Sequence, residues 1–258
     1  MSGLADRLPR GFRLPQLPRL RPERPPRPLH VDGRPSARER VYGLGTVFAK
    51  SWRDSRRGMI AGGLGLGLLV FFTASQVAIE FGTAAARAQL AALPEQLPPM
   101  FRGLLGEPIN VATMGGFLSW RTLNFITLVV GAWSIVALSG TLATEALRGS
   151  LDLVASTPRP RVSVALQKAA GHVAAVAVAM LVLAAFLWAS GAAFGSLPGD
   201  EIAIGDALAH TAWLGVMALV PGSLAWALAP VVGRGASRAV ATVVMVASFM
   251  VHGFRDTV

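Results

Sequence analysis

Hydrophobic residues fall into long uncharged runs, separated by polar or proline-containing segments. About 20 consecutive apolar residues are needed to cross a hydrocarbon core of roughly 30 Å, and several runs approach or exceed that length. The predicted spans are residues 59–79, 122–142, 169–194, 207–232 and 239–254. The fifth run has only 16 uncharged residues, at the short edge of the usual range. The pattern predicts an all-α polytopic membrane protein with about five transmembrane helices in residues 58–258.

A different pattern precedes the first span, where apolar residues recur at helical spacing and basic residues occupy much of the remainder. This pattern predicts an amphipathic helix over residues 37–57. Beside a span, such a helix is expected to lie in the membrane interface as an elbow, although a plain cytoplasmic helix is the alternative. The elbow residues expected to meet acyl chains or headgroups are Phe48, Lys50, Trp52, Arg53, Arg56 and Arg57.

Residues 1–36 are rich in arginine and proline and contain few bulky apolar residues. Proline lacks an amide donor and disfavours helix in the residue before it, so this segment is expected to be a disordered tail. A proline-rich ligand for a groove-binding domain is the alternative.

The composition supports the membrane interpretation, and the distribution of charge predicts how the chain is oriented in the membrane. Charged residues make up 15% of the chain, below the roughly 25% of soluble domains. The first 57 residues hold 14 of the 24 Lys and Arg residues, and the loop after the third span holds none. The positive-inside rule therefore predicts a cytoplasmic N-terminus and a multi-pass protein of the cell membrane, with residues 145–168 cytoplasmic. Beside a span, this basic excess favours anionic lipid over nucleic acid as the partner.

The first span contains a glycine run from Gly62 to Gly67. A dinucleotide-binding loop would have to follow a strand and open a helix of a soluble α/β unit, which does not fit an apolar segment. Gly63 and Gly67 instead have the small-xxx-small spacing that lets membrane helices approach closely.

Catalytic chemistry is not indicated. The three histidines within predicted spans, His172, His210 and His252, lie on different spans without an acidic partner at a useful spacing. The absence of cysteine excludes disulfides and thiolate metal sites. The sequence lacks the P-loop pattern, and its predicted spans lack pairs of charged residues of the kind that ion-coupled carriers use. We therefore expect no enzyme activity, metal or cofactor in this chain, and any energy source to be on a separate polypeptide.

The loop after the second span gathers acids, bases, a glycine and prolines between two apolar runs. Its residues suit either a protruding contact with another protein or a solvated loop that carries the positive-inside charge. The candidate contact residues are Glu145, Arg148, Gly149, Leu151, Asp152, Pro158 and Arg161.

This loop resembles that of ABC-2 type exporter permeases, especially the actinobacterial branch of polyketide-antibiotic or tetronasin-like exporters. The matching pattern is Glu145-x-x-Arg148-Gly149-Ser150-Leu151-Asp152-Leu153-x-x-Ser156-Thr157-Pro158-x-x-Arg161. A second match precedes the first span, and it reads Gly45-x-x-Phe48-x-Lys50-Ser51-x-Arg53-Asp54-Ser55-Arg56-Arg57.

The resemblance implies that a coupling helix in the loop docks on a separate ABC nucleotide-binding subunit, which binds ATP and Mg²⁺. Glu145, Arg148, Asp152, Pro158 and Arg161 would then face the ATPase. The chain would be the transmembrane subunit of an exporter of hydrophobic or amphipathic compounds, such as antibiotics, drug-like molecules or lipids.

Length separates this chain from that branch, whose members usually have two halves of six spans. The chain resembles only the N-terminal half, and it would be either a fragment of a longer permease or a half-size subunit. To enclose a transport pathway it would need a second permease half or would have to form a homodimer. The alternative function is a membrane-anchored scaffold or assembly protein that recruits a soluble partner through its basic, proline-rich tail.

Overall fold

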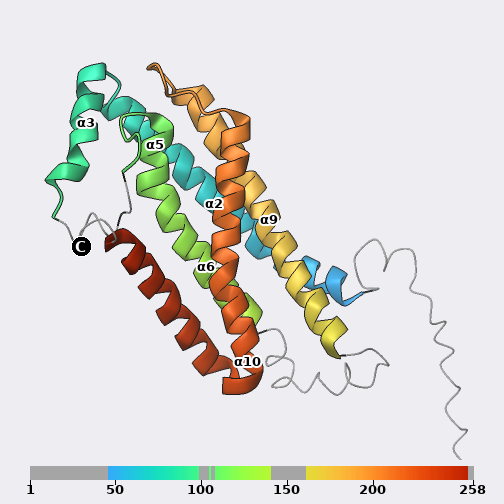
Figure 1. Cartoon of the computed structure of the whole chain (residues 1–258). Coiled ribbons are helices and arrows are strands. Elements are labelled where there is room, and N and C mark those ends of the chain that lie inside the picture. The colour runs from blue at the N-terminus through green and yellow to red at the C-terminus, as the bar shows by residue number, and fades with distance from the viewer. Residues whose placement is uncertain (1–45, 99–104, 106–107, 141–160, 255–258) are drawn as a thin grey trace, which may run out of the picture. The chain divides into compact units, whose positions relative to one another are not determined.

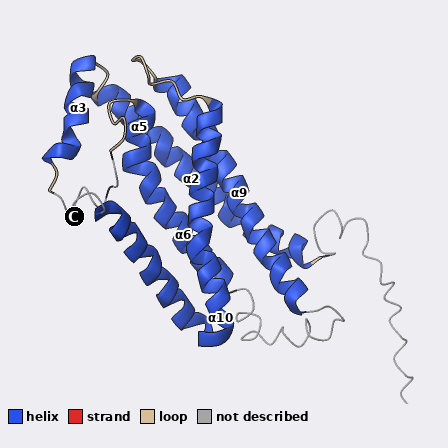
Figure 2. Cartoon of the chain, viewed as in Figure 1, coloured by secondary structure: helices blue, strands red, loops and turns tan. Residues whose placement is uncertain are grey.

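The computed structural model describes residues 46–98, 105, 108–140 and 161–254, and Figure 1 shows their arrangement. The chain divides into two units, Met1–Arg34 and Pro35–Val258, and every described residue belongs to the second unit. Within the described residues the regular structure is helical, without strands (Figure 2). The fold is thus that of an all-α polytopic membrane protein, as the hydrophobic pattern predicts.

Helix α2 (Val47–Glu80) contains both the elbow residues and the first predicted span. The Thr46 hydroxyl caps the helix by accepting a hydrogen bond from the Ala49 amide at 3.0 Å. The helix then continues for 34 residues without a break at Arg57, where the sequence predicted the elbow to end. At 1.5 Å per residue, it exceeds the thickness of the hydrocarbon core by more than ten residues. Residues 47–57 of the predicted elbow are therefore continuous with the span, whereas residues 37–45 lie outside the described residues.

The second span is longer than the hydrophobic run predicted. It comprises α5 (Met114–Leu118), the π-helical turn η1 (Ser119–Leu123) and α6 (Asn124–Ser139). Together they form a continuous apolar run of 26 residues that begins eight positions before the predicted start. The short helix α3 (Ala84–Gln96) lies in the segment that was predicted to connect the first two spans.

Helix α9 (Arg161–Phe194) contains the third predicted span, and α10 (Ile204–Phe254) contains the fourth and fifth. The 51 residues of α10 form two helical arms, because the backbone leaves helical geometry at Gly233 (φ 80°, ψ 166°). Figure 1 shows the second arm running back from the turn at an angle to the first. Four described helices are long and apolar enough to cross a membrane, and α10 accounts for two predicted spans.

Two helix pairs organise the bundle: α2 packs along α9, and α6 packs along α10. Gly63 and Gly67 of α2 are buried against α9, where a Cβ atom on Gly63 would lie 3.2 Å from Val182 Cβ and one on Gly67 would overlap the ring of Phe186. Cβ atoms on Gly62 or Gly65 would meet nothing within 4 Å. The glycines with small-xxx-small spacing are thus those at the helix contact.

Many large apolar side chains point away from the core. Examples on α2, α6 and α10 are Phe72, Phe125 and Trp213, each 62% exposed. In water such surfaces would be unfavourable, but they suit a lipid environment or the surface of another membrane helix.

Candidate functional site

The predicted coupling residues Glu145, Arg148, Gly149, Leu151, Asp152 and Pro158 lie outside the described residues. Arg161 is the first residue of α9, so this helix begins where the predicted coupling loop ends. What the structure does describe is the contact between the first turns of α9 and the predicted elbow.

At this contact, the Phe48 amide donates a hydrogen bond to Gln167 Oε1 at 3.3 Å. The amide belongs to the first turn of α2, where backbone N–H groups have no partner within their own helix. One turn further along α9, a Cβ atom on Gly171 would lie 2.9 Å from Ser51 Cβ, so a side chain there would obstruct the crossing. The helix that follows the loop is therefore held directly against the elbow.

The elbow side chains differ in their exposure. Phe48, Lys50, Arg56 and Arg57 are exposed, whereas Trp52 and Arg53 are half-buried. The exposed bases and aromatic ring have the character expected of an interfacial segment.

A buried ion pair lies at the opposite end of the bundle, between Arg87 of α3 and Asp200 of the segment before α10. Arg87 is 3% exposed and Asp200 is 1% exposed, and their Nη2 and Oδ2 atoms are 3.0 Å apart. The guanidinium also donates to the Phe81 carbonyl at 2.7 Å and to the Ala112 carbonyl at 3.2 Å. This cluster of bonds joins three separate connections between helices.

Backbone amides complete the coordination of Asp200. Its Oδ1 accepts from the Met114 amide at 2.8 Å, and its Oδ2 accepts from the amides of Ser196 and Leu197 at 3.3 and 3.2 Å. Because Met114 opens α5, the carboxylate caps the start of the second span, where the helix dipole favours negative charge. Since both charges are satisfied by fixed partners, we interpret this pair as structural.

The sequence pattern does not predict the pairing of Arg87 with Asp200. They are 113 positions apart, and neither belongs to a motif. Their roles depend on the tertiary fold, which sequence spacing does not reveal.

Two histidines within spans have separate serine partners. His172 Nε2 lies 3.1 Å from Ser134 Oγ, with the Trp133 ring packed edge-on against the imidazole, while His210 Nε2 lies 3.4 Å from Ser119 Oγ. The two serines are separated by 15 positions along one helical run, or about 20 Å. No group of three or more His, Cys, Asp or Glu side chains among the described residues could hold a metal ion.

The turn of α10 contributes a cation to the end of α6. Arg238 Nε donates to Ser139 Oγ at 2.7 Å, and Arg238 Nη2 donates to the Val136 carbonyl at 3.1 Å. A positive charge that binds a carbonyl of the last turn stabilises a helix C-terminus. Arg238 therefore fixes the end of α6 from which the predicted coupling loop departs.

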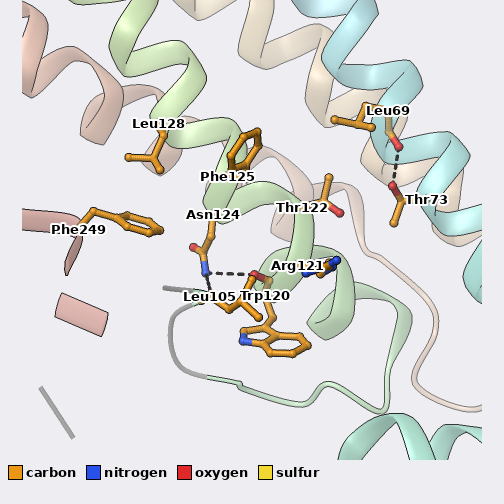
Figure 3. Close-up of a pocket in the computed structure, with 10 residues that line it drawn as sticks. All are labelled: Leu69, Thr73, Leu105, Trp120, Arg121, Thr122, Asn124, Phe125, Leu128 and Phe249. Carbon is orange, nitrogen blue, oxygen red and sulfur yellow. Dashed lines mark hydrogen bonds between the residues drawn. The ribbon is translucent and has the colours of Figure 1, made fainter. Parts of the chain in front are cut away.

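A cavity of about 430 Å³ lies beside the π-helical turn, and Figure 3 shows its lining. Pockets for small molecules typically have volumes of roughly 300–1,000 Å³. The lining residues come from α2, η1, α6, the second arm of α10 and the intervening Leu105: Leu69, Thr73, Leu105, Trp120, Arg121, Thr122, Asn124, Phe125, Leu128 and Phe249.

The π-helical turn shapes this cavity. The Asn124 amide bonds to the Ser119 carbonyl, five residues earlier. The Asn124 side-chain amide donates to the Leu105 carbonyl at 2.9 Å and to the Trp120 carbonyl at 3.4 Å (Figure 3). Single π-turns of this kind occur often at functional sites.

Comparisons of the chain with models of known protein families, with curated proteins and with solved structures found no match.

Proposed function

We propose that the chain is the transmembrane permease subunit of an ABC exporter, driven by a separate ATPase subunit. Its cargo would be a hydrophobic or amphipathic compound that leaves the cell. Support comes from the resemblance of residues 145–161 to the coupling loop of ABC-2 type permeases, and from the all-α membrane-spanning fold.

The observation that carries the proposal is the contact between α9 and the elbow. A displacement of the loop by an ATPase would act directly on the start of α9 at Arg161. The Phe48–Gln167 hydrogen bond and the close approach at Gly171 would transmit this displacement to the beginning of α2. Both helices of the α2–α9 pair would then move together.

A second permease subunit, either another half or a second copy of this chain, is part of the proposal. The apolar side chains of α2 and α10 that point away from the core provide surfaces for such a partner. Association of membrane helices is favoured by close packing, and a pathway enclosed by two subunits would use these faces.

The proposal is tested by the charge reversal Glu145→Lys in the predicted coupling loop. The membrane-embedded chain is purified from its native membranes with its bound proteins, and a co-purifying soluble ATPase is measured by mass spectrometry and by nucleotide hydrolysis. We expect the wild-type chain to retain an ATPase and Glu145→Lys to lose it, because a repulsive charge at a protein interface weakens binding. Insertion into the membrane is expected to be unchanged.

The matched control is Glu95→Lys, the same charge reversal at an exposed position of α3. This control should retain the ATPase. Retention of the ATPase by Glu145→Lys would contradict the coupling assignment. If the wild-type chain instead retains a soluble protein without ATPase activity, and loses it on deletion of residues 1–36, the scaffold alternative replaces the exporter.

A further inference from the structure

The cavity beside the π-helical turn combines an apolar wall with a single charged side chain. Leu69 and Phe125 are 44% and 62% exposed, so the cavity opens at the apolar outer surface of the bundle. Leu128 of α6 and Phe249 of the second arm of α10 extend the apolar lining. A ligand with a hydrocarbon part could therefore enter from the membrane.

Arg121 is the one charged residue among the described lining residues. Its guanidinium forms neither an ion pair nor a hydrogen bond with any other residue that the structure describes. The hydroxyl of the neighbouring Thr122 likewise has no hydrogen-bond partner within the described ranges. The π-helical turn thus provides two adjacent donors in the cavity wall, and one of them carries a positive charge (Figure 3).

Other polar groups of the lining are already engaged. The Thr73 hydroxyl donates to the Leu69 carbonyl at 2.8 Å, and the Asn124 amide group donates to two carbonyls. The side-chain oxygen of Asn124 remains an acceptor, but the one formal charge among the described lining residues is the positive charge of Arg121. The absence of a carboxylate from the described lining disfavours a cation. A guanidinium beside a hydroxyl suits a carboxylate or phosphate group.

We propose that this cavity binds a single-chain anionic amphiphile, with its acid group on Arg121 and Thr122. Its hydrocarbon chain would lie against Leu69, Phe125, Leu128 and Phe249. The volume of about 430 Å³ favours one chain over a two-chain phospholipid. The site requires neither ATP nor a partner subunit, so the proposal stands independently of the exporter function.

The test measures binding of radiolabelled hexadecanoic acid to the purified full chain in nanodiscs of phosphatidylcholine, in alkaline buffer. Hexadecanol, with the same chain and no charge, is the matched ligand. We expect the acid to bind more tightly than the alcohol. Arg121→Gln should weaken binding of the acid about tenfold and leave the alcohol unchanged, because the lost hydrogen bond is to a charged group.

Three further variants separate the site from general effects. Arg57→Gln removes an exposed charge from the elbow and should leave binding unchanged. Arg121→Lys keeps the charge and should retain part of the preference for the acid, while Leu128→Trp fills the cavity and should weaken both ligands. Circular dichroism and gel filtration establish that each variant is folded.

Equal binding of acid and alcohol by the wild-type chain would overturn the proposal, as would no binding at all. An equal loss in Arg57→Gln would show a general effect of surface charge and would also overturn it. If nanodiscs containing phosphatidylglycerol abolish binding of the acid, the site belongs to a membrane phospholipid, and the assignment to a single-chain ligand is wrong.

Discussion

Arg87 and Asp200 show how a buried charge is accommodated in this fold. Removing a charge from water is costly, and the cost is offset here by one ion pair and five hydrogen bonds to backbone groups. Because the partners come from three different connections between helices, the pair fixes the positions of α3, α5 and the start of α10 together. Loss of either charge would leave the other buried without compensation.

We predict that Asp200→Asn strongly destabilises the protein, although the two side chains have almost the same size and shape. The amide would present N–H groups to Arg87 or to the surrounding backbone amides, and the Arg87 charge would lose its counter-ion. Breaking a buried ion pair typically costs about 3–5 kcal/mol. Thermal unfolding of the purified protein in detergent should show a clearly lower midpoint for Asp200→Asn.

The control is Glu201→Gln, which removes the neighbouring carboxylate at an exposed position. Its unfolding midpoint should stay close to that of the wild type, since surface substitutions usually change stability by no more than about 0.5 kcal/mol. Equal midpoints for Asp200→Asn and the wild type would contradict the structural role of the pair.

The glycines of α2 illustrate what sequence can predict about single residues. The spacing of Gly63 and Gly67 is a local property of one helix, and both face α9. The spacing does not reveal the partner helix, nor that Phe186 lies over Gly67. Contacts such as Phe48–Gln167 and Arg238–Ser139 are also invisible in sequence, because they depend on which helices become neighbours.

Among the elements, α10 departs most clearly from a regular helix. The sequence predicted a loop over residues 233–238 between two spans, whereas the structure reverses the chain direction mainly at Gly233. Its φ of 80° with ψ of 166° belongs to a region that is essentially restricted to glycine. The following residues resume helical geometry and position Arg238 on the end of α6.

We predict that Gly233→Ala destabilises the turn of α10 by about 1–3 kcal/mol, because a Cβ atom is strained in this backbone conformation. Gly235→Ala is the matched control: an added Cβ meets nothing within 4 Å at either position, but Gly235 does not have the positive φ. Hydrogen exchange of the last turn of α6, measured by mass spectrometry, should increase in Gly233→Ala alone. Similar exchange in the two variants would contradict a backbone effect at residue 233.

Two features of the helices could not be predicted from the hydrophobic pattern. The π-helical turn inserts an extra residue into the helix, which the spacing of hydrophobic residues does not reveal. The Asn124 side chain donates to the Trp120 carbonyl of this turn and to the Leu105 carbonyl outside it. The second span begins at Met114 because Thr113 caps α5 and Asp200 binds its first amide, although the adjoining segment looked like a loop. In contrast, the long apolar runs themselves were predictive, since length and hydropathy decide which helices fit a membrane.

At the scale of the whole molecule, the order of the spans along the chain does not give their packing. Helix α2 packs against α9, and α6 packs between the two arms of α10, where a Cβ atom on Gly131 would lie 2.7 Å from Met245 Sδ and 3.4 Å from Pro221 Cγ. Hydropathy predicts which helices lie in the membrane, but it does not predict which helices pack against each other. The structure also separates the bundle into an end with the Arg87–Asp200 pair and an end with Arg238 and the α9–elbow contact.

The predicted orientation places the Arg238 end in the cytoplasm and the Arg87–Asp200 end outside the cell. The chain contains no cysteine, so a single introduced cysteine would be the only thiol of the chain. We expect a membrane-impermeant maleimide to label Glu201→Cys in intact cells, and Gly235→Cys only after permeabilisation, because both positions are exposed at opposite ends of the bundle.

Val243→Cys tests whether the second arm of α10 is a span. Val243 is 66% exposed near the middle of this arm, so in a membrane it would face lipid or another helix. A thiol there should resist the maleimide in both intact and permeabilised cells, and react only after unfolding in detergent. Labelling before unfolding would show that this arm does not lie in the membrane, and the prediction of a fifth span would be wrong. The reverse labelling pattern at Glu201→Cys and Gly235→Cys would show that the orientation is opposite to the predicted one. The predicted ATPase-binding loop would then lie outside the cell, where it could not meet a cytoplasmic ATPase.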